Sequence, residues 1–356
     1  MPEQENYFNN LKVWSPGYQA IVWGFDYPQV VDLETALQQQ HKIAVLPVFF
    51  DRPTEFSYKQ EFQGVDLAQF DLVLFTDIEF RQQTELMQWI ETTSAKNWLL
   101  CVGGLWNHEI LDPRSVYRPT WSFSFLQWNQ VREDFPLQRP FLFDCLCGTR
   151  RTHRDYVMLS LIESGLIDRT LATYRDVFVG GDITATPPEI SAEFPNITVP
   201  WPYVSPNLDP AWEVQDKLDN SISGIVPWEI YNRTYYTILV ETLGNRDTYL
   251  MAEKIGKCLF ARRVFVHFGS PDWLSKLRGF GFETFGSVLD ESYDSIENNI
   301  DRWRAAFVQV KKLSELDPVE VLQQVKPVLE HNHHRLFAFR EEKKQEMQQR
   351  VLSYLK

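Results

Sequence analysis

The chain has 356 residues, of which 44% are hydrophobic and 14% aromatic, and its formal net charge at pH 7 is −13. That apolar content can build substantial cores, which excludes a disordered chain, and the length favours two domains or one large one. The negative charge repels nucleic-acid phosphates over the molecule as a whole. It therefore gives no general reason to expect nucleic-acid binding.

The N-terminal stretch, the lengths of the apolar runs and the cysteines indicate the kind of protein and its location in the cell. The N-terminal stretch MPEQENYFNN has neither the basic nor the apolar region of a signal peptide. No apolar run approaches the roughly 20 residues that a bilayer span needs, so we expect a cytoplasmic protein with no membrane span. Four cysteines are too few and too scattered for a disulfide framework. Cys145 and Cys147 alternate along a predicted strand and are expected to pack in a core rather than to bind metal.

The first third alternates between strand and helix patterns. Short apolar runs predict strands at 19–24, 42–50, 71–77 and 97–104. Helical patterns at 32–40 and 82–93 lie between them. This alternation predicts a parallel sheet covered by helices. Residues 105–139 are rich in Trp and Pro without a clear period, and we expect them to form connecting segments.

The pattern restarts near residue 138 with a strand, a basic turn and a helix. Further strands are predicted at 176–181, 235–241 and 263–269. From 317 onward the pattern is helical, with one apolar stripe formed by Met347, Val351, Leu352 and Leu355. We therefore predict an N-terminal domain at 1–137, a second α/β domain at 138–314, and C-terminal helices at 315–356.

An acidic and a basic residue, Glu253 and Lys254, stand at the start of a helix predicted to begin near Tyr249. That helix follows a strand ending at Glu241, and ligands of open α/β sheets collect at such carboxyl ends. The free N–H groups of a first helical turn attract phosphate, and Lys254 adds a full positive charge. Glu253 is suited to accept hydrogen bonds from ribose or sugar hydroxyls. The alternative is an ordinary solvent-facing pair.

A second basic element, GTRRTHR at 148–154, follows a predicted strand and opens the next helix. Its Arg150, Arg151 and Arg154 can each donate two hydrogen bonds to one phosphate. The alternative is an exposed cationic loop without a ligand. The chain has no Gly-x-Gly-x-x-Gly fingerprint and no Walker lysine motif, which disfavours a dinucleotide-binding dehydrogenase and a P-loop enzyme.

Residues 235–271, YYTILVETLGNRDTYLMAEKIGKCLFARRVFVHFGSP, resemble the donor-binding segment of the alpha-1,3-fucosyltransferase family, glycosyltransferase family 10. Residues 273–294, WLSKLRGFGFETFGSVLDESYD, resemble the bacterial or viral branch of such transferases. Glu241 matches the acid that ends the family's first strand, Ala252-Glu253-Lys254 matches its Thr-Glu-Lys, and Gly269-Ser270-Pro271 matches its Gly-Ser/Ala-Pro turn. Arg154 matches the family's phosphate-binding arginine. The resemblance covers roughly 140–295. It departs at Thr242-Leu243, which replaces Asn-Ser, and at Ala252, which replaces a hydroxyl residue.

The resemblance implies an α/β protein of the GT-B type, with two facing Rossmann-like domains, parallel sheets and a helical C-terminal segment. It implies a transferase that moves a sugar from a nucleoside-diphosphate sugar, such as one of the GDP-fucose type, to a glycan or other acceptor hydroxyl. Transfer with inversion, without a metal and without a cofactor other than the donor, is expected. Arg154 and Lys254 would bind the diphosphate, with Arg150 and Arg151 nearby. Glu253 would bind ribose or sugar hydroxyls, and Glu241 would lie near the transferred sugar.

An inverting transfer needs a general base, usually a carboxylate or histidine, within reach of the acceptor hydroxyl. Asp26, Asp77, Glu79 and His108 lie at or after predicted strand ends and are the candidates, each with an equally good role as a helix cap or surface residue. The histidines of HNHHRLF, at 331, 333 and 334, lack the spacing of a helical metal pair, and we expect a surface helix there.

Two other functions stay open. A transferase acting on modified DNA bases would share the fold but would need a basic acceptor groove, and residues 1–135 show no clear cluster of Lys and Arg for one. A non-catalytic nucleotide- or sugar-binding protein would keep the donor residues and lack the base.

If the donor is held by the C-terminal domain and the acceptor by the Trp-rich N-terminal one, the reaction requires closure about a hinge, for which 131–140 is the candidate. A nucleoside diphosphate should then reduce the radius of gyration in solution scattering. It should also slow hydrogen exchange at 104–130 as well as at 148–154 and 241–257. Protection of the last two segments alone, with an unchanged radius of gyration, would indicate a rigid, preformed site instead.

Overall fold

The computed structural model describes residues 11–15, 29–47, 64–77, 83–106, 112–117, 119, 136–174, 185–208, 225–244 and 248–355. The chain forms two compact units. The first comprises Met1–Ser124, Asp247–Leu250 and Phe339–Lys356, and the second comprises Phe125–Arg246 and Met251–Ala338. In the part of the chain that is described, no helix is long and apolar enough to cross a membrane.

The first unit contains a six-stranded sheet in the order β2-β1-β3-β4-β5-β7, and every neighbouring pair is parallel. Its strands are β1 (Lys12–Trp14), β2 (Gln29–Val31), β3 (Ile43–Pro47), β4 (Leu72–Asp77), β5 (Trp98–Val102) and β7 (Ser115–Tyr117). Helices α2 (Leu33–Leu37) and α3 (Gln83–Glu91) and the short helix η1 (Leu67–Gln69) connect them. A separate antiparallel pair joins β6 (Gly104–Trp106) to β12 (Thr248–Leu250).

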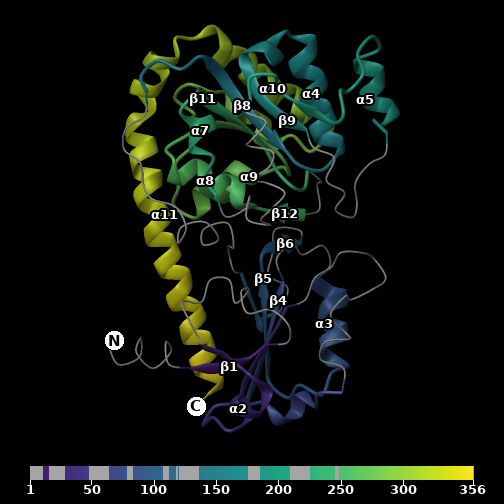
Figure 1. The fold of residues 1–356 in the computed structure, drawn as a ribbon, viewed down its shortest axis with the longest axis vertical. Helices are drawn as coiled ribbons and strands as arrows, with labels where there is room; N and C mark the ends of the chain where they lie inside the picture. The colour runs from purple at the N-terminus through teal and green to yellow at the C-terminus, as the bar shows by residue number, and fades with distance from the viewer. Residues whose placement is uncertain are drawn as a thin grey trace. The chain divides into compact units, whose positions relative to one another are not determined.

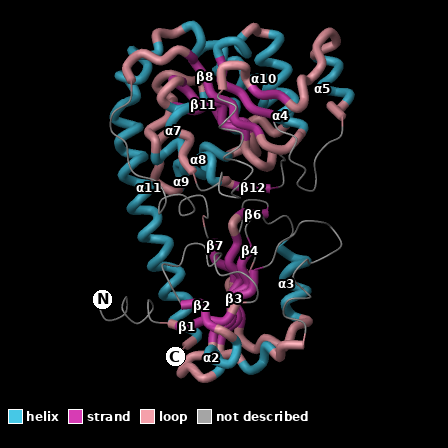
Figure 2. The backbone as a smooth tube through the Cα atoms, viewed as in Figure 1, coloured by secondary structure: helices cyan, strands magenta, loops and turns pink. Residues whose placement is uncertain are grey.

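The second unit contains a five-stranded sheet in the order β10-β9-β8-β11-β13, parallel except for β10. Its strands are β8 (Phe141–Cys147), β9 (Thr170–Tyr174), β10 (Tyr203–Val204), β11 (Thr234–Val240) and β13 (Val264–Phe268). Its helices up to residue 315 are α4 (Thr152–Glu163), η3 (Leu166–Arg169), α5 (Pro188–Glu193), α7 (Trp228–Tyr231), α8 (Glu253–Phe260), α9 (Trp273–Gly279), η5 (Glu291–Ser295) and α10 (Asn299–Glu315). Figures 1 and 2 show the strands of this unit surrounded by these helices, with α4 and α10 side by side.

The long helix α11 (Pro318–Tyr354) ends the described chain, as the helical pattern from 317 predicted. Its residues up to Ala338 belong to the second unit and those from Phe339 to the first. Three of the four residues of the predicted apolar stripe are confirmed there, because Met347 and Val351 lie in the core of the first unit and Leu355 packs against it. Leu352 is half-buried and is not part of that core.

The α/β class with two parallel sheets and a helical C-terminal segment is confirmed. The predicted strands at 42–50, 71–77 and 97–104 correspond to β3, β4 and β5. The strands predicted at 19–24 and 176–181 lie outside the described residues. The facing GT-B arrangement of the two units stays a prediction.

Two expectations about irregular or exposed segments were wrong. Residues 105–139 are not purely connecting, because β7 adds to the edge of the first sheet and β6 pairs with β12. His333 is not a surface histidine: it is buried, and its ring packs against Phe260, whose carbonyl lies 2.8 Å from its Nδ1. His331 and His334 are exposed as expected.

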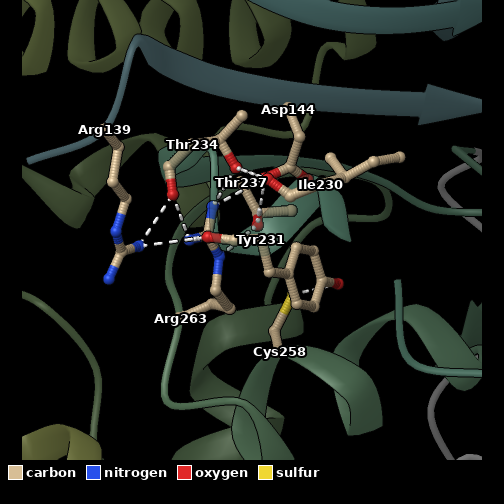
Figure 3. A network of polar contacts seen from close by, with 8 residues as sticks. All are labelled: Arg139, Asp144, Ile230, Tyr231, Thr234, Thr237, Cys258 and Arg263. Carbon is tan, nitrogen blue, oxygen red and sulfur yellow. Dashed lines mark hydrogen bonds and ion pairs between the residues drawn. The ribbon is translucent and has the colours of Figure 1, made fainter. Parts of the chain in front are cut away.

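A buried ion pair connects neighbouring strands of the second unit (Figure 3). A guanidinium nitrogen of Arg263 lies 2.6 Å from Asp144 Oδ2, and both side chains are 1% exposed. Arg263 also donates to the hydroxyls of Thr234 and Thr237 and to the carbonyls of Thr234 and Tyr231. Because Asp144 is on β8, the threonines are on β11 and Arg263 precedes β13, one charge pair links three neighbouring strands. Burial raises the pKa of the Asp144 carboxyl, although Arg263 opposes this shift.

Removing Arg263 should therefore destabilise the second unit strongly, because Asp144 would keep a buried charge without its partner. We expect Arg263→Met to lower the free energy of unfolding by about 3–5 kcal/mol in urea denaturation. The control is Arg304→Ala, whose side chain is 52% exposed in its pairs with Glu193 and Asp301, and which should cost at most about 1 kcal/mol. Equal losses in the two variants would contradict this account.

Candidate functional site

The candidate site lies at the carboxyl ends of two neighbouring parallel strands of the second unit. Strand β8 pairs with β11 at the centre of the sheet, so the residues after Cys147 and after Val240 emerge at the same edge. The first segment leads into α4 and the second is followed along the chain by α8. Ligands of open α/β sheets bind at such edges, where loops and helix N-termini converge.

Glu241, the first residue after β11, is 0% exposed. Both of its carboxylate oxygens lie 3.3 Å from the backbone nitrogen of Ala252, and Oε2 lies 3.3 Å from the nitrogen of Thr242. Ala252 is the N-cap of α8 and has no side chain with which to cap it. Glu241 thus accepts from the amide of the N-cap residue itself, and a carboxylate at this helix end interacts favourably with the helix dipole. Burial raises the pKa of Glu241 to about 7, although Lys254 opposes the shift.

The start of α8 differs from its prediction. The helix begins at Glu253 rather than near Tyr249, because residues 248–250 form β12 instead. Glu253 and Lys254 are therefore the first two residues of the helix, closer to its N-terminus than expected. This placement brings both side chains to the end where backbone N–H groups have no partner within the helix.

Arg154, in the first turn of α4, is 3% exposed and interacts with neutral acceptors. Its guanidinium donates to the carbonyl and hydroxyl of Thr149 at 2.7 and 2.9 Å and to the carbonyl of Glu241 at 3.3 Å. Its Nε is buried and has no hydrogen-bond partner. Among the residues that the structure describes, no carboxylate lies within ion-pair distance of it. A buried cation without an anion is costly, so this arrangement favours a ligand with negative charge.

His153 holds the loop that follows β11. Its Nε2 lies 2.7 Å from the carbonyl oxygen of Glu241, and a Cβ at Gly244 would lie only 2.7 Å from its Nδ1. Gly244 is therefore needed for the loop to pack against this ring. Burial, followed by the positive charges of Arg154, Arg151 and Lys254, lowers the pKa of His153 to about 3. The ring is neutral at physiological pH, and its pKa reports three cations gathered around it.

Lys254 and Glu253 form the more exposed part of the site. The Lys254 ammonium lies 3.2 Å from the hydroxyl of Thr242 and 3.5 Å from a Glu253 oxygen, and the two side chains are 21% and 25% exposed. Burial would raise the pKa of Glu253, but Lys254 and Lys257 outweigh it and lower that pKa. Burial lowers the pKa of Lys257 itself to about 8. Lys254 can therefore contact a ligand while Glu253 stays ionised beside it.

The remaining arginines of the basic loop have other contacts. Arg150 forms an ion pair with Asp155 at 3.0 Å and donates to Thr186. Arg151 is the N-cap of α4, is 9% exposed, and donates to the Thr149 hydroxyl at 3.4 Å. Of the expected phosphate ligands, the structure thus brings Arg151, Arg154 and Lys254 together and joins Arg150 to Asp155.

The candidate bases are not located by the structure. Asp26, Glu79 and His108 lie outside the described residues. Asp77 ends β4 in the first unit, and only its backbone is described. Within the described ranges, no group of three or more His, Cys, Asp or Glu side chains could hold a metal ion. The cysteines 145 and 147 are free and buried, as predicted.

Two residues of this edge were not singled out from the sequence. Arg302 of α10 donates to the carbonyls of Gly269 and Gly244, and so fixes the loops after β13 and β11. His267 of β13 stacks on Trp273 at 4.0 Å between ring centroids, and its buried Nε2 has no partner. A histidine inside the apolar run VFVHF was the available signal for His267. Arg302 lies in an ordinary helical pattern and gave none.

No protein-family model matches the chain, and no curated protein matches it. Among solved structures it is similar to phage T4 beta-glucosyltransferase, with a TM-score of 0.37 and 10% identity over 97% of this chain and 99% of that one. It is also similar to alpha-1,3-fucosyltransferase with GDP, with a TM-score of 0.36 and 11% identity over 90% of each chain. For the complex with GDP-fucose the TM-score is 0.32, with 11% identity over 90% of each chain. At such scores the likeness carries no argument about function.

Proposed function

We propose that this chain is a glycosyltransferase that uses a nucleoside-diphosphate sugar as donor and transfers the sugar to an acceptor hydroxyl. The observation that carries the proposal is Arg154, a buried guanidinium at the carboxyl end of β8 whose hydrogen-bond acceptors, among the described residues, are backbone carbonyls and a hydroxyl. A diphosphate is the ligand that best matches this cation together with Lys254. Both residues stand in first helical turns, where the helix dipole also favours anions.

The donor's parts can be assigned to residues by charge. Arg154 and Lys254 bind the diphosphate, with Arg151 close by, because each adds a positive charge near His153. Glu253, ionised and partly exposed beside Lys254, accepts hydrogen bonds from ribose or sugar hydroxyls. The diphosphate charge is then neutralised by side chains alone, so the transfer needs no metal.

The acceptor hydroxyl has to lose its proton during the transfer. A transfer with inversion places a base beside the acceptor hydroxyl, and Asp26, Asp77, Glu79 and His108 of the first unit are its candidates. The resemblance of 235–271 to the donor-binding segment of fucosyltransferases favours a donor of the GDP-fucose type. Thr242 and Ala252 stand where that segment has other residues, so a screen has to include other sugars and bases.

The test begins with a thermal-shift screen of nucleotides and nucleotide sugars, because a ligand at about 100 times its dissociation constant stabilises the folded protein by roughly 2.7 kcal/mol. With the best ligand, Arg154→Ala and Lys254→Ala should each weaken binding by about tenfold or more, since a charged hydrogen bond contributes about 1.5–3 kcal/mol. The matched control is Lys312→Ala, an exposed lysine of α10, which should leave the affinity unchanged.

Lys254→Ala keeps this test decisive if Arg154→Ala does not fold, because Lys254 is partly exposed. Unchanged affinity in Lys254→Ala and in a folded Arg154→Ala would refute the site. If the donor binds but is neither transferred to an acceptor nor hydrolysed, the chain is instead a non-catalytic binding protein.

Donor binding should also survive removal of divalent metals, because arginine and lysine rather than a metal neutralise the diphosphate. We expect the dissociation constant, measured by isothermal titration calorimetry, to be the same with and without EDTA. Loss of binding in EDTA that added magnesium or manganese restores would show that the phosphate site is built around a metal.

A further inference from the structure

The carboxylate of Glu241 is buried with only weak partners. Charge-assisted hydrogen bonds to a carboxylate are typically about 2.7–2.9 Å long, whereas the backbone nitrogens of Thr242 and Ala252 lie 3.3 Å from it. No ammonium or guanidinium lies within ion-pair distance of the carboxylate among the described residues. A buried carboxyl in such a setting favours its neutral form, because desolvation penalises the charge and the contacts do not compensate for it.

Charged and titratable groups approach this carboxyl from several elements. Lys254 and Glu253, on α8, act on it with opposite sign. On α4, His153 and Arg154 bind the carbonyl of Glu241 itself. The remaining two are His267 on β13, whose ring borders Gly269 as Glu241 does, and Arg302 on α10, which binds the Gly269 carbonyl. Both histidines are held neutral, because burial lowers the pKa of each.

The negative charge of the proposed diphosphate ligand would lie at the N-terminus of α8, close to Glu241. Glu241 accepts from the N-cap residue of α8, and Lys254, a proposed diphosphate ligand, is the second residue of that helix. An ionised Glu241 would repel the diphosphate in a low-dielectric setting, whereas a protonated Glu241 would not.

We propose that Glu241 is a proton-binding positioning residue: it takes up a proton when the anionic donor binds, so that this carboxyl makes donor affinity depend on pH. This inference rests on the proposed function. It assigns Glu241 a role through α8 and its charge, not a direct contact with the sugar. The raised pKa of Glu241, about 7, places the transition in the physiological range.

The binding test compares the wild type with Glu241→Gln, which keeps the shape of the protonated carboxyl and cannot lose a proton. The probe is the nucleoside-diphosphate sugar selected by the screen, whose phosphates do not titrate near neutral pH. Wild-type affinity should fall about tenfold from pH 6 to pH 8.5, as a one-unit rise of the Glu241 pKa in the complex implies. Glu241→Gln should show a smaller fall, because Lys257, whose pKa is about 8, still titrates in this range. Glu189→Gln, at an exposed site on α5, should behave as the wild type.

Calorimetry in buffers of different ionisation enthalpy should show uptake on the order of half a proton per ligand near pH 7 in the wild type and clearly less in Glu241→Gln. A pH dependence that is the same in Glu241→Gln and the wild type would overturn the proposal, as would an affinity of the wild type that does not change with pH.

A second measurement does not involve a ligand. Because the pKa of Glu241 is raised from its ordinary 4.5 to about 7 in the folded protein, folded Glu241 holds a proton that the unfolded chain has lost. Its contribution to stability is therefore lost as pH rises between these values and is constant above them. Relative to Glu241→Gln, the wild type should lose unfolding free energy over that range.

The two measurements separate the two claims. Absence of nucleotide-sugar binding at every pH, with the ligand-free titration as expected, would refute the proposed function and the coupling to a ligand. If the nucleotide sugar binds but the stability of the wild type and of Glu241→Gln depends on pH in the same way, the proposed role of Glu241 is refuted and the proposed function is not.

Discussion

The buried ion pair between Asp144 and Arg263 is the interaction on which the second unit depends. It joins β8, β11 and β13, because a single guanidinium binds one carboxylate oxygen, two hydroxyls and two backbone carbonyls. A pair this deeply buried is weak evidence for net stability, but breaking it leaves a charge in the core. Its consequence is geometric, because it fixes three neighbouring strands relative to one another and so fixes where their carboxyl ends emerge.

At the carboxyl ends of those strands the same sheet holds charges that are incompletely paired. Among the described residues, no anion lies beside the buried Arg154, and Glu241 is buried with three hydrogen bonds of 3.3 Å. Other buried polar atoms of this unit also lack a partner, Asp144 Oδ1 among them. Arg154 and Glu241 differ in lying together at the carboxyl ends of β8 and β11, where Arg154 binds the Glu241 carbonyl. Perturbed charges gathered at such an edge are candidates for a functional site.

The loop after β11 begins with Glu241 and contacts Arg154. His153 and Arg154 bind the carbonyl of Glu241, while the carboxylate of the same residue accepts from the amide of Ala252, the N-cap of α8. Arg302 binds the carbonyl of Gly244 at the end of the described part of this loop. Both α4 and α10 therefore contact the loop that bonds to the N-terminus of α8, where Lys254 and Glu253 stand.

The sequence by itself determined the alternation of strands and helices, the helical C-terminus, and the position of the basic loop and of the Glu253-Lys254 pair at carboxyl ends of strands. These follow from local periodicity, which needs no knowledge of partners. It did not predict β9, whose sequence TLATY has little apolar contrast, or β6 and β7, which are three residues each and gain their hydrogen bonds from distant strands.

Only the tertiary structure decided which members of the basic loop are paired with an acid. Arg150 and Arg154 are indistinguishable by their spacing in the sequence. In the structure, Arg150 binds Asp155 and Thr186. Arg154 instead donates to Thr149 and to the Glu241 carbonyl. Likewise, Glu241 was recognised as a strand-end acid, but its bond to the amide of Ala252 spans 11 residues of chain. Burial and pairing depend on contacts between segments far apart in sequence, and these contacts set the charge that each residue carries.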